Sequence, residues 1–167
     1  MSLHGENTRV PLLIRLPQAR GGGRRIDSLV GIVDLMPTLL ALAGAEPPPG
    51  LQGRNLSAVI EEPGYELPGF PVFSSAVLGH PAQVSVEEDH WKVIWDRTGG
   101  KPRLYDLSAD PEEQKDQAGA DPGTQRRLAR LISAHLQELA SRPSLAETAS
   151  GPTEEELNQL RGLGYIR

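Results

Sequence analysis

The sequence predicts an α/β fold in two parts: a segment of a larger sheet, then a small antiparallel sheet packed on a C-terminal helix. Three observations predict it. Residues 10–16 form an almost continuous apolar run, apolar and polar residues alternate in short stretches between 71 and 107, and an amphipathic pattern runs from Leu128 to Leu139. Continuous apolar runs are typical of strands covered on both faces, and alternation is typical of strands with one wet face.

Composition excludes several classes of protein. The 167 residues carry 17 Lys and Arg against 22 Asp and Glu, a net charge of −5, which argues against nucleic acid as a partner. No apolar run approaches the roughly 18 residues that indicate a membrane span. Cysteine is absent, so disulfides, thiolate nucleophiles and cysteine zinc sites are excluded.

The first part, residues 1–62, is expected to contain two short strands and a helix. Val10–Leu16 and Leu29–Val33 have the apolar character of buried strands. A helix is predicted from Asp34 to Gly44, because an acidic residue begins it and a glycine ends it. Residues 56–60 suggest one further helical turn.

The second part, residues 63–167, reads as a sheet with helices. Four strands are expected, over residues 71–78, 83–87, 91–96 and 103–107, with turns between them. Trp91 and Trp95 are expected to share one strand face beneath the long helix.

Helix starts in this part follow from proline and acidic residues. Asp110-Pro111 predicts a short helix, and Asp121-Pro122 begins the long one. Residues 141–151 read as a polar tether, and Thr153 with Glu156 predicts a capping box for a last helix.

Histidines are the first candidates for chemistry, and they form no His-Glu-x-x-His motif. His80, in a Gly-His-Pro loop, is the candidate substrate-binding residue, because loops often carry function. His135 lies on the apolar face of the long helix and is interpreted as a core or boundary residue. Asp89-His90 has the residue types of a metal-binding pair, but a polar hairpin turn without a further carboxylate predicts only solvated side chains.

One serine resembles a nucleophile. Ser141-Arg142-Pro143-Ser144 is similar to part of a Ser-x-Pro-Ser motif, but nothing nearby would activate it, so Ser141 is interpreted as a helix-terminal residue. The residues by themselves therefore predict no catalytic residue and no metal site.

Six segments carry a resemblance that is stronger together than singly. They are Thr8–Arg15, Val33–Gly44, Gly53–Leu56, Trp91–Ile94, Leu104–Gln114 and Glu155–Tyr165. In this order and spacing they resemble the C-terminal third of a sulfatase of the alkaline-phosphatase-like superfamily. The resemblance implies a partial alkaline-phosphatase-like sheet in residues 1–62, the tail of the catalytic α/β domain, and a sulfatase C-terminal subdomain in residues 63–167.

The resemblance also implies a function for a longer parent protein. Sulfatases hydrolyse sulfate esters with a formylglycine, made from Cys or Ser, and a divalent metal, usually calcium. Neither the formylglycine motif nor the metal motifs occur in this sequence, so the chain alone is expected to be inactive.

Two alternatives stay open: a phosphonate or phosphate ester hydrolase of the same superfamily, and a non-catalytic interaction module. The expected partners are the N-terminal catalytic part and a sulfate-ester substrate. Self-association is also expected, because residues 10–16 would otherwise lack neighbouring strands.

Overall fold

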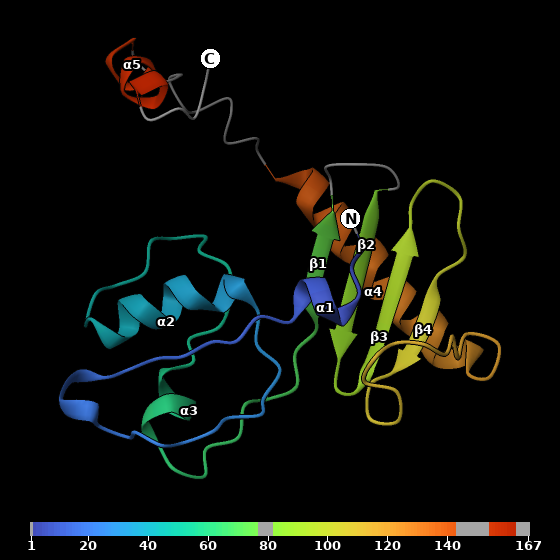
Figure 1. The fold of residues 1–167 in the computed structure, drawn as a ribbon, viewed down its shortest axis with the longest axis horizontal. Coiled ribbons are helices and arrows are strands. Elements are labelled where there is room, and N and C mark those ends of the chain that lie inside the picture. Colours follow the sequence, from blue (N-terminus) through green and yellow to red (C-terminus); the bar gives the residue numbers. More distant parts are fainter. Residues whose placement is uncertain (1, 77–81, 143–153, 163–167) are drawn as a thin grey trace. The chain divides into compact units, whose positions relative to one another are not determined.

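A computed structural model describes residues 2–76, 82–142 and 154–162. Contacts divide the chain into two compact units, Met1–Ser133 and Ala134–Arg167. In chain order the elements are α1 (Gly5–Thr8), two 3-10 turns (Pro17–Ala19 and Ile32–Asp34), α2 (Leu35–Leu42), α3 (Ser57–Glu61), β1 (Val72–Ala76), β2 (Gln83–Glu88), β3 (Trp91–Asp96), β4 (Arg103–Asp106), α4 (Pro122–Ser141) and α5 (Glu154–Gly162) (Figure 1).

The four strands form one antiparallel sheet in the order β1-β2-β3-β4. Each strand pairs with its neighbour in sequence, with Val86 opposite Val93 and Val93 opposite Leu104. The predicted strands are confirmed to within one or two residues at each end in the described part. The turn between β2 and β3 is tight, and Asp89 takes a left-handed φ of 54° there.

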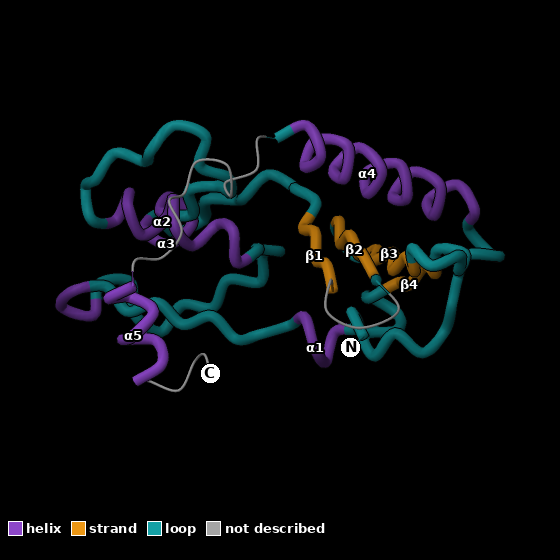
Figure 2. The backbone as a smooth tube through the Cα atoms, turned by 90° about the horizontal axis from the view of Figure 1, so that it is seen from above, coloured by secondary structure: helices purple, strands orange, loops and turns teal. Residues whose placement is uncertain are grey.

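The sheet is covered on both faces (Figure 2). Strand alternation directs Val86, Val93 and Leu104 to one face, and all three are fully buried, as are Leu128 and Ile132 of α4, which lies along that face.

The opposite face is covered by the N-terminal segment, which the sequence did not predict. Leu3 packs in a cluster with Ala76, Ile94 and Tyr105, and its N–H donates to Gln83 Oε1 at 3.2 Å.

Helix α4 begins where the sequence predicts. Asp121 Oδ1 accepts the N–H of Thr124 at 3.0 Å, and Pro122 occupies the first helical position. Its first turns are tied to the sheet by an ion pair between Arg127 and Glu88. Of the predicted tether, residues 143–151 lie outside the described residues, as does Thr153, the expected cap of α5.

Residues 10–16 are not a strand here, which corrects the prediction. Val10, Leu12 and Leu13 are 63%, 46% and 89% exposed, and the segment runs without ladder partners among the described residues. A strand exists only where a neighbour satisfies its N–H and C=O groups, so an apolar run alone does not make one. Leu29–Val33, also predicted as a strand, is not one either; it leads into α2 through the 3-10 turn at Ile32–Asp34.

Helices α2 and α3 confirm the predicted helices at residues 34–44 and 56–60, although the Asp34 side chain makes no capping hydrogen bond to α2. Gly44 ends α2 with a φ of +70°, and the N–H of Ala45 reaches back to the carbonyl of Leu40 at 2.9 Å. The C-terminal end of α3 receives Arg24, which donates to the carbonyls of Val59 and Ile60. This contact ties the loop that contains Gly21, Gly22 and Gly23 to α3.

The prediction of a short helix beginning at Asp110-Pro111 is wrong. Residues 110–121 form consecutive turns instead, because Glu113 takes a left-handed φ of 57° that a helix does not allow. Asp110 still organises the loop, since its Oδ2 accepts the N–H of Lys115 at 2.7 Å.

Candidate functional site

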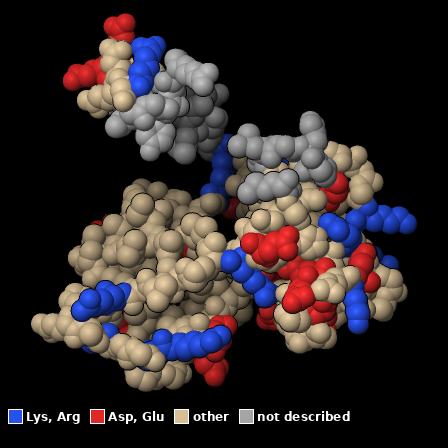
Figure 3. All heavy atoms as spheres, viewed as in Figure 1, with Lys and Arg blue, Asp and Glu red and all other residues tan. Residues whose placement is uncertain are grey.

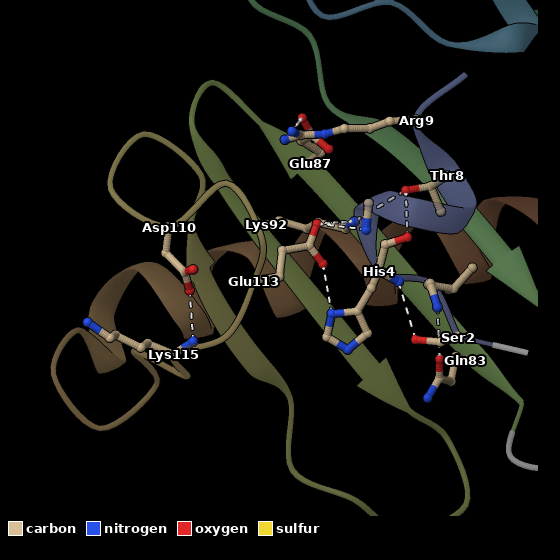
Figure 4. Close-up of polar contacts among 12 residues, drawn as sticks. Ser2, His4, Thr8, Arg9, Gln83, Glu87, Lys92, Asp110, Glu113 and Lys115 are labelled. Atoms are coloured by element: carbon tan, nitrogen blue, oxygen red, sulfur yellow. Dashed lines mark hydrogen bonds and ion pairs between the residues drawn. The ribbon is translucent and has the colours of Figure 1, made fainter. Parts of the chain in front are cut away.

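Three segments bring ionisable side chains together on the sheet face opposite α4 (Figure 4). The segment around α1 contributes His4, β3 contributes Lys92, and the loop after β4 contributes Glu113. We call these three residues the Glu113 network.

The centre of the network is a buried ion pair. Lys92 Nζ lies 2.8 Å from Glu113 Oε1, and the two side chains are only 2% and 0% exposed. Removing one partner of such a pair leaves an uncompensated buried charge, so both must be present together. Lys92 also donates to Thr8 Oγ1 at 3.3 Å.

The N-terminal segment supplies the other donors to Glu113. The N–H of Gly5 donates to Oε1 at 2.9 Å, and His4 Nδ1 lies 3.0 Å from Oε2. A Cβ on Gly5 would lie 3.0 Å from Oε1, so the close approach of this backbone favours glycine. Glu113 thereby ties residues 4–8 to the sheet.

The loop that carries Glu113 is held against β4 just after Glu113. Asp116 Oδ1 accepts the N–H of Leu104 at 3.0 Å, and the carbonyl of Leu104 accepts the N–H of Gln117 at 2.7 Å. Left-handed φ is uncommon for a residue other than glycine and costs free energy. Glu113 has such a φ, and the buried contacts of its carboxylate help to hold it in this conformation.

Burial near the Glu113 network shifts the pKa values of two neighbouring residues. Burial raises the pKa of Glu87, although the charges of Arg9 and Lys92 oppose the shift. Arg9 Nη2 lies 3.7 Å from Glu87 Oε1. Burial likewise raises the pKa of Tyr105.

A second polar cluster surrounds Asp34. Its Oδ1 accepts the backbone N–H of Arg54 at 2.7 Å, and its Oδ2 accepts Arg54 Nη2 at 2.9 Å and the N–H of Gly31 at 3.0 Å. Burial alone would raise the pKa of Asp34, but these hydrogen bonds and the charge of Arg54 outweigh it and lower the pKa.

Thr38 extends the Asp34 cluster. Its hydroxyl donates to the carbonyl of Asp34 at 2.6 Å and accepts the N–H of Leu56 at 2.9 Å. The cluster therefore fastens α2 to the segment before α3.

The residues singled out from sequence are placed as follows where the structure describes them. His80 lies outside the described residues, so its substrate contact stays a prediction. Asp89 and His90 are exposed in the turn after β2. The Ser141 hydroxyl donates to the carbonyl of Glu138 at 2.8 Å, a helix-end contact.

His135 is half-buried on α4, and burial lowers its pKa. This matches its interpretation as a residue at the edge of an apolar face.

Sequence reasoning missed the Glu113 network. The available signal was Lys92, a charge in the middle of the apolar strand Trp91–Asp96. Its partner was assigned to a helix start, so the pairing could not be anticipated. Chemically, the network can hold and orient groups, and its Lys92 and Glu113 side chains are buried against each other.

Metal binding and membrane insertion were searched across the described residues. In that part of the chain no three His, Cys, Asp or Glu side chains converge as metal ligands would. Nor is any described helix long and apolar enough to cross a bilayer.

The chain matches a family model described as N-sulphoglucosamine sulphohydrolase, C-terminal, over residues 2–142. Among curated proteins it is 30% identical over 133 residues to arylsulfatase K of Xenopus laevis, covering 73% of this chain and 25% of that protein. It is 36% identical over 115 residues to the uncharacterized sulfatase YidJ of Escherichia coli strain K12, covering 67% and 22%. The chain thus spans about a quarter of the length of these relatives.

Solved structures show the same fold at lower identity. BT4656, in complex with its substrate D-glucosamine-2-N,6-O-disulfate, aligns with a TM-score of 0.50 at 23% identity, covering 62% of this chain and 23% of that one. The putative sulfatase yidJ from Bacteroides fragilis aligns with the same TM-score, 0.50, at 23% identity over 62% and 24%.

Proposed function

Because the chain belongs to the sulfatase family, within its N-sulphoglucosamine sulphohydrolase C-terminal group, we propose that it is the C-terminal part of an enzyme that hydrolyses sulfate esters. The observation that carries the proposal is the continuous family match over residues 2–142. In this proposal residues 1–62 are the tail of the catalytic α/β domain and residues 63–167 are the C-terminal subdomain.

The chemistry of the reaction belongs to the preceding part of the enzyme. A formylglycine needs a Cys or Ser in its own motif, and a calcium ion needs several oxygen ligands close together. The sequence contains no formylglycine motif, and among the described residues no three potential metal ligands converge. We therefore assign both groups to the N-terminal catalytic part.

Exposed apolar side chains support a missing partner in the same protein. Most of them belong to the first part of the chain: Val10, Leu12, Leu13, Ile26, Ile32, Val33, Met36 and Leu39. Figure 3 shows a broad uncharged surface over the region of α2. Exposed large apolar side chains gathered in one part of a chain are typical of a surface that another part of a protein covers. The occupant in this proposal is the catalytic part that precedes residue 1 in the parent protein.

The test uses the longer protein encoded by the same gene. We expect it to hydrolyse an aryl sulfate in a calcium-dependent reaction, and to lose this activity when residues 1–167 are removed. Preferential hydrolysis of a phosphate or phosphonate ester would favour the related hydrolase. A gene that begins at Met1 and a product without hydrolase activity would favour the interaction module.

A further inference from the structure

The two oxygens of the Glu113 carboxylate face different donors. Oε1 receives two of them, the N–H of Gly5 at 2.9 Å and Lys92 Nζ at 2.8 Å. Oε2 lies 3.0 Å from His4 Nδ1, and no hydrogen bond of regular geometry reaches it among the described residues. The side chain of Glu113 is completely buried, so this oxygen is shielded from bulk solvent.

We infer that Glu113 is a positioning residue that holds His4 with its proton on Nδ1, which leaves Nε2 of the neutral ring as a hydrogen-bond and proton acceptor. An ionised carboxylate offers only acceptors, so an unprotonated Nδ1 would place its lone pair 3.0 Å from a buried acceptor oxygen, and a proton on Nδ1 removes this repulsion. In a neutral imidazole one nitrogen donates and the other accepts, and the first hydrogen bond decides which is which.

The surroundings of His4 also fix the position of its ring. It meets the ring of Tyr105 edge-on, with centroids 5.4 Å apart and planes at 63°. Its backbone carbonyl accepts the N–H of Asn7 at 2.9 Å and the hydroxyl of Thr8 at 3.3 Å. The side chain keeps 22% exposure, so the ring is not sealed from solvent.

The orientation selects what His4 can bind. A neutral ring with its proton on Nδ1 accepts hydrogen bonds through Nε2, so the matching ligand group is a hydroxyl, an amide N–H or an ammonium. A sulfate oxygen, which only accepts, does not match. If the chain is part of a sulfatase as proposed, His4 is therefore suited to a donor group and not to the sulfate itself.

Substituting Glu113→Gln separates this role from simple packing. The amide has the shape of the carboxylate but only one acceptor oxygen. Gly5 and Lys92 both donate to the Oε1 side, so the amide oxygen must stay there and the NH₂ group must face His4. His4 Nδ1 then has to accept, and the proton moves to Nε2.

The experiment is ¹⁵N NMR of the His4 ring in the 167-residue chain, at a pH well above the usual histidine range. In the wild type we expect the signal of the unprotonated nitrogen to belong to Nε2, and in Glu113→Gln to belong to Nδ1. The matched control is Glu112→Gln, the exposed neighbour, which should leave the wild-type pattern unchanged.

The inference is overturned if wild-type His4 carries its proton on Nε2, or if a folded Glu113→Gln leaves the pattern unchanged. The wild-type measurement stands by itself if the variant does not fold. Neither outcome depends on hydrolase activity, so a failure here is distinct from a failure of the proposed function.

Discussion

Gly53 lies directly against the carbonyl group of Val33: a Cβ built on Gly53 would be 2.2 Å from the Val33 oxygen. Its φ of +91° is also one that other residues rarely adopt. Position 53 therefore requires glycine on two grounds, contact and conformation, and the contact brings the loop before α3 against the start of α2.

Gly53→Ala should strongly destabilise the chain, because the backbone must move to admit the methyl group. We expect a loss of more than about 2 kcal/mol in the free energy of unfolding, measured by urea denaturation. Gly119→Ala is the control, since a Cβ there meets nothing within 4 Å. Equal stability of the two variants would contradict the close contact.

Asp34→Asn should destabilise the chain by roughly 3 kcal/mol at neutral pH, because Arg54 loses its buried counter-charge. The folded pKa of Asp34 is lowered, so its contribution is present above the usual aspartate pKa of about 3.9 and is lost as pH falls through the folded value. The stability gap between wild type and variant should therefore close in acid. A gap that is constant from pH 7 to pH 3 would be evidence against this role.

Glu87→Gln should show the opposite pH dependence. The folded pKa of Glu87 is raised, so its ionisation costs stability as pH rises from the usual glutamate value of about 4.3 through the folded pKa. The variant avoids this cost and should be relatively more stable at neutral pH than at low pH. Thermal unfolding of the wild type and the variant across pH measures this difference. Asp34→Asn serves as the comparison, because its stability difference from the wild type should change with pH in the opposite direction.

Trp95→Ala should lower the thermal midpoint. Trp95 lies opposite Val84 and, by strand alternation, on the same face as the fully buried Val93. It keeps partial exposure, so we expect a loss of about 1–3 kcal/mol, below the roughly 3–5 kcal/mol typical of a fully buried tryptophan. Tyr65→Ala, at a 43% exposed position, is the control. An unchanged midpoint for Trp95→Ala would show that the predicted packing beneath α4 is wrong.

The purified chain should self-associate through its exposed apolar residues. Leu13, Ile32, Met36 and Leu39 are 89%, 74%, 56% and 55% exposed. Replacing all four by Gln should shift the chain towards monomer in light scattering. Deleting the first 60 residues is a poorer test, because it would also remove Leu3 and His4 from the sheet. A wild-type chain that stays monomeric at high concentration would refute the expectation.

The sequence by itself determined the elements whose signals are local. Alternation placed β2, β3 and β4, Asp121-Pro122 placed the start of α4, and Gly44 placed the end of α2, because each depends on residues within one or two turns of chain. The assignment to the sulfatase family came from the resemblance, which is also local, because each of its six segments is an unbroken stretch of sequence.

Only the tertiary structure decided which distant residues meet. The N–H of Gly5 reaches a carboxylate 108 positions away, and His4, Lys92 and Glu113 converge although no pattern in the sequence links them. The tertiary structure likewise left residues 10–16 unpaired despite their apolar run. In both cases the outcome depends on partners that are remote in sequence: a buried charge requires a counter-charge, and a strand requires a neighbouring strand.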